Sequence, residues 1–560
     1  MDRFPANIYQ FFSARYAEVT ATLMLIISGL KLTWGLEQSI DIGLYDESVY
    51  LQLGMLLKDW GISSENGPLY SAWYLVLSLL TTDKVNLYFL NYKISIVSLP
   101  ILVYVFLRKS GSGVIKSTLL AWFILISHGN LYVWPRVSHF ALNMILLVLI
   151  VNKGRKSWIH FSIIGSLGAL ILSYIRPEFF LSFIIFSLVF LASLVTKIPK
   201  QKKINLRLFT IYFLASFLLI NLFNLPIAGN RSFVAFGQHF SINWITWTKN
   251  QMNPWTDWEE IIPLNFADSN NILEMLRKNP VIFVKHLGTN LSGMKSAPEL
   301  ILPVFAYTGK TPQSNMLSPL PTSNVRSRQL LQEIVIIVLF LLILSFSLSN
   351  KHEIKAQIQK SKHFIYQILL FMLPAMIASI LIYPREHYLY ILIVLLYLLL
   401  SICILTISQS KPPDEHNKIL TQKILPLAFA LFLITPLPFL GGINNQPVLQ
   451  TIRLIDSLNI NKQVFMLEAE GGFNIYLNNN FDRVPEYKKN EGFYQFLKNK
   501  NINLVIVSPA LLNDIRFKDD PEWLNFLQHP HDLDFVKICL QKNDTVFLLL
   551  RKNLIDKKME

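Results

Sequence analysis

Long apolar runs separated by short polar segments dominate the first 440 residues. Most of them are close to 20 residues, the length at which an α-helix crosses the hydrocarbon core of a bilayer. The pattern predicts an all-α polytopic membrane protein with about 11 to 13 transmembrane helices. The runs lie at 18–37, 68–82, 88–107, 117–133, 138–151, 160–175, 178–196, 207–226, 330–349, 364–383, 388–408 and 422–440.

The pattern changes near residue 441. Short runs rich in β-branched and aromatic residues predict strands at 463–468, 503–508, 534–539 and 545–551, and the stretch 521–528 predicts a helix. Strands that alternate with helices are typical of an α/β domain. We therefore predict a transmembrane module at 1–440 and a small C-terminal α/β domain at 441–560.

Basic residues are distributed unevenly between the polar segments. The segments 1–17, 108–116, 152–158, 197–207, 350–363 and 409–423 together hold 20 Lys and Arg, whereas 38–67, 127–139, 175–177 and 384–387 hold four. Positively charged loops favour the cytoplasmic side of a membrane. The ratio predicts a cytoplasmic N-terminus, with the loop 38–67, the long loop 227–329 and the C-terminal domain on the extracytoplasmic side.

One run does not fit this topology. An odd number of crossings must separate the loop 38–67 from the loop 108–116, but two apolar runs lie between them. The run at 68–82 is short and begins at Gly67-Pro68. Either it is re-entrant or interfacial, or a further crossing lies within 82–107.

Composition narrows the classes of function. Hydrophobic residues make up 52% of the 560 and charged residues 16%, which excludes a soluble enzyme and a disordered chain. Two cysteines, Cys403 and Cys539, exclude a disulfide framework and a cysteine-rich metal site. The net charge of +15 is mostly accounted for by the basic loops, so we expect no nucleic-acid partner.

Candidate acid–base chemistry gathers on the predicted extracytoplasmic side. Asp41, Asp46 and Glu47 follow the first apolar run closely, and Tyr50, Pro68 and Tyr70 come soon after them. A carboxylate near the bilayer can act as a general base for a hydroxyl or amine nucleophile. The alternatives are an acidic first turn on an interfacial helix at 48–60 and, for the tyrosines and Pro68, an aromatic belt at a helix start.

Arg136, Arg176 and Arg385 stand against the charge bias, and Lys93 lies within the run 88–107. A guanidinium group binds phosphate through paired N–H donors and a lysine supplies a point charge, so the set predicts a site for an anionic headgroup. The alternative is pairing with neighbours, Arg176 with Glu178 and Arg385 with Glu386. His387 follows directly, but no histidine spacing on this side resembles a metal-binding signature.

Together these residues resemble the C-type glycosyltransferase (GT-C) superfamily, in particular the group of protein O-mannosyltransferases, lipid A aminoarabinose transferases and lipopolysaccharide core transferases. The resemblance rests on Tyr45-Asp46-Glu47-Ser-Val-Tyr50, Gly67-Pro68-Leu69-Tyr70, Leu90-Asn-Tyr-Lys93-Ile-Ser95 and Pro384-Arg385-Glu-His-Tyr388. Two positions depart from the family. Gly67 replaces the first proline of a Pro-Pro-Leu segment, and Lys93 stands where the family usually has arginine.

The resemblance implies an inverting enzyme that transfers one sugar from a polyprenyl-phosphate donor to a lipid, glycan or protein acceptor on the extracytoplasmic face. Asp46 would be the general base, and Glu47 would orient the acceptor. Some relatives use a divalent ion, which Asp41, Asp46 and Glu47 could hold, but no cofactor is required by the sequence. The donor phosphate would be bound by Lys93, Arg136, Arg176 and Arg385, and the substrate pocket would be lined by Asp41, Tyr50, Pro68, Tyr70 and His387.

Three other functions stay open on the sequence alone. A transporter or flippase of lipid-linked sugars would share the many spans and the basic residues, and would place polar groups at mid-membrane. A polysaccharide polymerase or ligase would use the long loop 227–329. A membrane scaffold would leave Asp46 and Glu47 dispensable.

Overall fold

The computed structural model describes two compact units, each assembled from segments that are distant in the sequence. The described residues are 6–44, 46–60, 67–131, 134–153, 155, 157–197, 202–227, 231–303, 351–405, 413–439, 446–484, 491–514, 516–540 and 543–554. The first unit takes the described residues of 1–34, 61–70 and 92–438. The second takes those of 35–60, 71–91 and 439–560.

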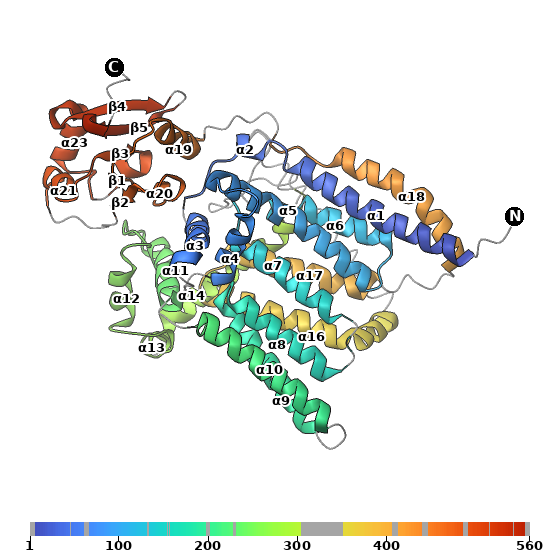
Figure 1. Cartoon of the computed structure of the whole chain (residues 1–560). Helices are drawn as coiled ribbons and strands as arrows, with labels where there is room; N and C mark the ends of the chain where they lie inside the picture. Colours follow the sequence, from blue (N-terminus) through green and yellow to red (C-terminus); the bar gives the residue numbers. More distant parts are fainter. Residues whose placement is uncertain are drawn as a thin grey trace. The chain divides into compact units, whose positions relative to one another are not determined.

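The first unit is a bundle of apolar helices (Figure 1). Its long helices are α1 (Ala6–Leu32), α5 (Lys84–Lys109, from Tyr92 onward), α6 (Val114–Leu125), α7 (Val137–Asn152), α8 (Trp158–Ser173), α9 (Phe180–Lys197), α10 (Lys202–Phe223), α16 (Lys351–Leu381), α17 (Glu386–Leu405) and α18 (Pro413–Ile434). Short described segments join α5 to α6 at 110–113, α8 to α9 at 174–179 and α16 to α17 at 382–385.

Several of these helices are suited to a membrane. Four described segments are long and apolar enough to cross one: Arg15–Ser39, Lys84–Lys109, Pro177–Val195 and Ser361–Leu381. Six shorter apolar helices accompany them, at Val114–Leu125, Val137–Asn152, Trp158–Ser173, Arg207–Phe223, Glu386–Ile402 and Lys423–Ile434. The prediction of a polytopic helical membrane protein is confirmed. The expected run at 330–349 lies outside the described residues, and the total of about 11 to 13 spans stays a prediction.

Helix α8 packs tightly because it carries glycine where its neighbours approach. A Cβ on Gly168 would lie 2.6 Å from a methyl group of Val148 on α7, and a Cβ on Gly165 would lie 2.7 Å from the ring of Phe186 on α9. Small residues that let helix backbones come close are a main source of packing between membrane helices. Replacing either glycine would force its neighbour to move.

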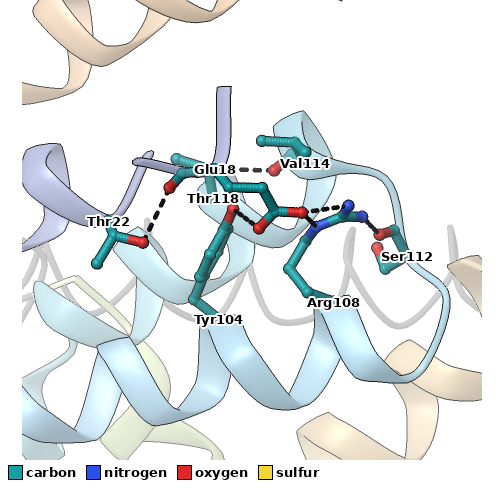
Figure 2. A network of polar contacts seen from close by, with 7 residues as sticks. All are labelled: Glu18, Thr22, Tyr104, Arg108, Ser112, Val114 and Thr118. Carbon is teal, nitrogen blue, oxygen red and sulfur yellow. Dashed lines mark hydrogen bonds and ion pairs between the residues drawn. The ribbon is translucent and has the colours of Figure 1, made fainter. Parts of the chain in front are cut away.

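A polar network ties the last turn of α5 to α1 (Figure 2). Glu18 on α1 accepts hydrogen bonds from Nε and Nη2 of Arg108, at 2.9 and 2.6 Å, and from the hydroxyl of Tyr104 at 2.8 Å. Nη1 of Arg108 donates to the backbone carbonyl of Ser112 in the turn before α6. The charge of Arg108 is thus neutralised by a carboxylate of the fold itself.

The run predicted at 68–82 is helical only over α4 (Pro68–Leu77), which has 10 residues. At 1.5 Å per residue it is about 15 Å long, about half of the hydrocarbon thickness. Helix α4 is too short to cross a membrane. This length favours the non-crossing alternative for the run, and the number of crossings between the loops 38–67 and 108–116 stays a prediction.

The long loop predicted from residue 227 is largely helical up to residue 303. It contains α11 (Arg231–Thr248), α12 (Trp258–Phe266), α13 (Ile272–Lys278), α14 (Pro280–Gly293) and the 3₁₀ segment η3 (Met294–Ile301). These helices share an aromatic core of their own around Phe236, Phe240, Phe266 and Phe283. Residues 304–329 lie outside the described residues.

The second unit contains an α/β domain, the segment that precedes α4, most of α4 and the first part of α5. The segments are α2 (Leu36–Ser39), α3 (Asp46–Trp60) and the described residues of 71–91. The domain is built from α19 (Pro447–Ser457), β1 (Val464–Leu467), α20 (Phe473–Tyr476), β2 (Phe481–Arg483), α21 (Phe493–Asn499), β3 (Leu504–Val507), α22 (Pro509–Leu512), α23 (Pro521–Gln528), β4 (Phe535–Leu540) and β5 (Asn543–Arg551).

Its five strands form one mixed sheet in the order β2-β1-β3-β5-β4. Strand β1 is parallel to β2 and β3, whereas β5 is antiparallel to β3 and β4. Trp523, Phe493 and Phe526 pack into its core with the apolar side chains of β3. The predicted α/β character is confirmed, while the short strand β2 and the helices α19 and α21 are additional elements.

Candidate functional site

Asp46 and Glu47 open helix α3 in the second unit and differ in their surroundings. Asp46 is exposed, and both carboxylates lie in the first turn, where the helix dipole favours negative charge. Glu47 is only 4% exposed. Its Oε1 accepts hydrogen bonds from the Tyr74 hydroxyl and, at 3.1 Å, from Nδ2 of Asn91. Asp46 is therefore the carboxylate that a substrate can reach, and Glu47 belongs to a buried polar network.

This network joins α3, α4 and α5 through Asn91. Its Nδ2 lies 2.8 Å from the hydroxyl of Tyr74, and its Oδ1 accepts a hydrogen bond from Nε1 of Trp73 at 2.9 Å. Buried polar groups that satisfy one another fix a unique arrangement of the elements that carry them. Sequence reasoning missed Asn91, although a polar residue inside an apolar run two positions before Lys93 is a usable signal.

Residues of the α/β domain hold the segment that carries Asp46. The Ser48 hydroxyl lies 2.9 Å from the hydroxyl of Tyr476, and Asp41 accepts hydrogen bonds from the backbone N–H groups of Val448 and Leu449, both at 2.9 Å. These N–H groups belong to the first turn of α19, which has no intrahelical acceptor for them. Burial raises the pKa of Tyr476, so its hydroxyl stays protonated. Asp41, predicted as a pocket residue, caps a helix.

The other predicted pocket residues of this stretch are buried or begin a helix. Tyr50 on α3 is 6% exposed. Pro68 begins α4, and Tyr70 in its first turn is fully buried, with its ring 5.2 Å from that of Phe140 in the first unit. Their part in a substrate pocket stays a prediction.

Arg176 lies in the first unit between α8 and the 3₁₀ turn η2 (Pro177–Phe179), and is 6% exposed. Its Nε donates to Oε1 of Glu178 at 2.6 Å, and its Nη1 donates to the hydroxyl of Ser138. The guanidinium also lies over the ring of Tyr388, 4.1 Å from the centroid. The pairing of Arg176 with its neighbour, one of the two alternatives, is thus observed.

Arg136 and Arg385 have aromatic and neutral contacts. Arg136 precedes α7 and stacks on Trp134 at 4.2 Å from the ring centroid. Arg385 precedes α17, and its Nε donates to Nε2 of His239 at 2.8 Å. The alternative for Arg385 was an ion pair with Glu386. Among the described residues, Arg385 instead donates to the imidazole of His239. Its charge is not cancelled by the group that holds it.

The three arginines converge on one side chain. His387, the second residue of α17, is buried, and Arg136, Arg176 and Arg385 all interact with it electrostatically. Arg136 also acts on Tyr92 of α5, the residue before Lys93, which is half-buried. The structure thus places the three arginines around the start of α17, whereas the part of Lys93 in the site stays a prediction.

The predicted site residues divide between the two units. Asp41, Asp46, Glu47 and Tyr50 belong to the second, and Pro68, Tyr70, Lys93, Arg136, Arg176, Arg385 and His387 to the first. Within the part of the chain that the structure describes, no group of three or more His, Cys, Asp or Glu side chains is arranged to hold a metal ion. His239, a partner of Arg385, was not among the predicted site residues.

No protein-family model matches this chain, and no curated protein sequence matches it. Among solved structures it is similar to ArnT from Cupriavidus metallidurans in the apo state, at 10% identity and a TM-score of 0.39, over 95% of this chain and 97% of that one. It is also similar to the same protein bound to undecaprenyl phosphate, at 9% identity and a TM-score of 0.36, over 97% and 99%. ArnT is a lipid A aminoarabinose transferase, from the group that the sequence resembles.

Proposed function

We propose that this protein is a membrane glycosyltransferase that transfers one sugar from a polyprenyl-phosphate donor to a hydroxyl or amine of a lipid, glycan or protein acceptor. The observation that carries the proposal is that Arg136, Arg176 and Arg385 all act electrostatically on the buried His387, and that Arg176 lies over the ring of Tyr388, three residues after Arg385. Several guanidinium groups around one side chain favour an anion with several oxygens, and phosphate accepts paired N–H donors from arginine.

The reaction needs one base and a stabilised leaving group. The acceptor oxygen or nitrogen attacks the anomeric carbon of the sugar and its proton passes to Asp46, while the bond from that carbon to the phosphate oxygen breaks. Polyprenyl phosphate leaves with one more negative charge, which the arginines offset, and the configuration at the carbon inverts. Fixed cations placed where charge develops lower the barrier most in a site shielded from water.

Different roles follow for the two carboxylates. Asp46 is exposed at the start of α3, so it is the proposed base. Glu47 is buried and bonded to Tyr74 and Asn91, so its proposed role is to fix the first turn of α3 and thereby the position of Asp46. An extracytoplasmic location of both is part of the proposal, because it follows from the distribution of basic loops.

The test is sugar transfer in membranes that contain the wild type, Asp46→Asn or Asp83→Asn. The membranes are given a panel of polyprenyl-phosphate sugars and a cell-envelope extract as the source of acceptor, and release of polyprenyl phosphate is followed by mass spectrometry. We expect wild-type release from one donor and a loss of ~100- to 10,000-fold in Asp46→Asn.

Asp83→Asn is the matched control. Asp83 is an exposed carboxylate of the same unit that accepts a hydrogen bond from the N–H of Asn86, and asparagine caps a helix as well as aspartate does. It should transfer at the wild-type rate. Wild-type activity in Asp46→Asn would refute the role of this carboxylate, and absence of release from every donor by well-inserted wild type would refute the transferase.

A further inference from the structure

Arg385 is held by a histidine from the helical segment 231–303. His239 on α11 is 5% exposed, and its Nε2 accepts the hydrogen bond from Nε of Arg385. Its other ring nitrogen, Nδ1, lies 2.6 Å from the backbone carbonyl of Ala235. A carbonyl can only accept, so Nδ1 carries the ring proton, and Nε2 presents its lone pair to the guanidinium. The imidazole is therefore neutral and in one defined tautomer.

The environment keeps this imidazole neutral. Burial, and after it the neighbouring Arg385, lowers the pKa of His239 to about 3. A carboxylate in its place would orient the arginine equally well, but would cancel the charge of the guanidinium. A neutral acceptor fixes the direction of Arg385 and leaves its full positive charge available.

A second attachment fixes the backbone before Arg385. The last carbonyls of α16 have no acceptor role within their own helix. Nδ2 of Asn290 on α14 donates to the backbone carbonyls of Ile380 and Ile382, at 2.9 and 3.1 Å. Nε2 of His286, on the same helix, lies 3.1 Å from the backbone carbonyl oxygen of Leu381. The chain that leaves α16 toward Arg385 is thus anchored by the same helical segment that supplies His239.

We propose that His239 is a positioning residue of the donor site, which it serves by orienting Arg385 toward the phosphate of the lipid-linked donor; this rests on the function proposed above. Arginine has five N–H donors. One of them, on Nε, is used by His239. Within the described part of the chain Nη1 and Nη2 have no other hydrogen bond, although the guanidinium also lies 5.8 Å from the ring centroid of Trp255, so four donors can face phosphate oxygens. The helical segment 231–303 therefore fixes the position of Arg385. This role is separate from any contact that the segment makes with an acceptor.

A double-mutant cycle tests this role. The variants are His239→Leu, Arg385→Gln and the pair of them, with kcat and KM measured for the active polyprenyl-phosphate donor. We expect kcat/KM to fall about 10- to 100-fold in His239→Leu, since a hydrogen bond to a charged group is removed. The pair should be no worse than Arg385→Gln alone, because residues that act through one contact are not additive.

Two further variants separate positioning from stability. His239→Gln retains an acceptor and should recover kcat/KM to within about 5-fold of wild type. Phe240→Leu removes packing from the same helix without touching Arg385; it should lower the thermal midpoint at least as much as His239→Leu, with kcat/KM within about 3-fold of wild type. If His239→Leu does not accumulate in membranes, His239→Met replaces it in the cycle.

The outcomes are distinct from those of the transferase test. Full additivity in the cycle, or equal losses of kcat/KM in His239→Leu and Phe240→Leu, would overturn the positioning role while the transferase stands. Failure of the wild type to release polyprenyl phosphate would refute the transferase itself, and with it the donor site that His239 serves.

Discussion

Arg108 and Arg385 belong to the same helical unit and are held in opposite ways. Arg108, at the end of α5, donates twice to the carboxylate of Glu18, which also accepts from Tyr104 (Figure 2). Arg385, just before α17, donates to a neutral imidazole, that of His239. The first arginine is neutralised by the fold. The second is oriented by the fold and keeps its charge.

This difference teaches how to interpret basic residues in a membrane protein. The sequence places 20 Lys and Arg on one set of loops and four on the other, and the number alone would direct attention to the wrong end. What distinguishes an anion site is the kind of partner that each cation has. A carboxylate partner offsets much of the charge of a cation, whereas a neutral partner leaves that charge for a ligand.

The largest effect is expected at Arg176, which is intermediate between these two cases. It is buried and paired with Glu178, with side chains 7% and 19% exposed. Arg176→Gln leaves the partly buried carboxylate of Glu178 without its counter-charge, so we expect a loss of about 2 kcal/mol in stability. Thermal unfolding in detergent measures it, and Glu178→Gln/Arg176→Gln should recover most of the loss. A stable single variant with impaired transfer would instead group Arg176 with Arg385.

Arg385→Gln comes next and acts on activity. The variant keeps a donor for His239 but loses the charge, so we expect kcat/KM for the lipid-phosphate donor to fall ~100-fold with little change in stability. Arg385→Lys keeps the charge without the fork of donors and should lie between the two. Steady-state kinetics with the active donor checks both. Equal activity of Arg385→Gln and wild type would refute the claim that Arg385, unlike Arg108, keeps its charge for the donor.

Acid provides a third test, through the histidines of the segment 231–303. Burial, with Arg385 second, lowers the pKa of His239 to about 3, and burial lowers that of His286 to about 4. In the unfolded chain both titrate near 6.5. The unfolded state therefore binds more protons between about pH 6.5 and pH 4, and stability falls as the pH falls through this window, by about 1 kcal/mol per pH unit for each histidine.

Thermal midpoints between about pH 7.5 and pH 5 measure this dependence. It should be shallower in His239→Gln and shallower still when His286→Gln is added, because the titrating groups are then removed one at a time. An unchanged pH dependence in the double variant would show that neither imidazole is kept neutral by the fold.

The smallest effect is expected at Arg108. Glu18 and Arg108 have side chains 40% and 28% exposed, so water screens the pair and its contribution is at most about 1 kcal/mol. Arg108→Gln should transfer sugar within about 3-fold of the wild type, with a thermal midpoint only slightly lower. A large loss of transfer in this variant, measured beside Arg385→Gln, would remove the distinction between the two arginines.

Features set by local pattern could be predicted from the sequence. Run lengths near 20 residues gave the apolar helices, and β-branched runs gave β1, β3, β4 and β5 within two residues of their observed bounds. Strand β2 has only three residues, Phe481–Arg483, and too little pattern to be recognised. The helices α11 to α14 mix aromatic and polar residues in short stretches, so they could not be predicted from a long apolar run.

Contacts between distant segments could not be predicted. His239 and Arg385 are 146 residues apart, and Asp41 caps a helix 407 residues further on. Asp46 and Glu47 looked equivalent in the sequence, since adjacent carboxylates share one local pattern. Their burial differs because successive residues of a helix point in different directions, and only Glu47 points toward Tyr74 and Asn91.

The cap that Asp41 places on α19 has a consequence for building chimaeras. The C-terminal domain looks like a module that could be exchanged at a single junction near residue 440. Its compact unit nevertheless includes 35–60 and 71–91, so a graft at one junction would separate Asp41 from α19 and Ser48 from Tyr476. A working exchange between related proteins needs all three segments of this unit, and therefore five splice points. A chimaera should therefore take the segment that carries the proposed base, Asp46, from the same parent protein as the C-terminal domain.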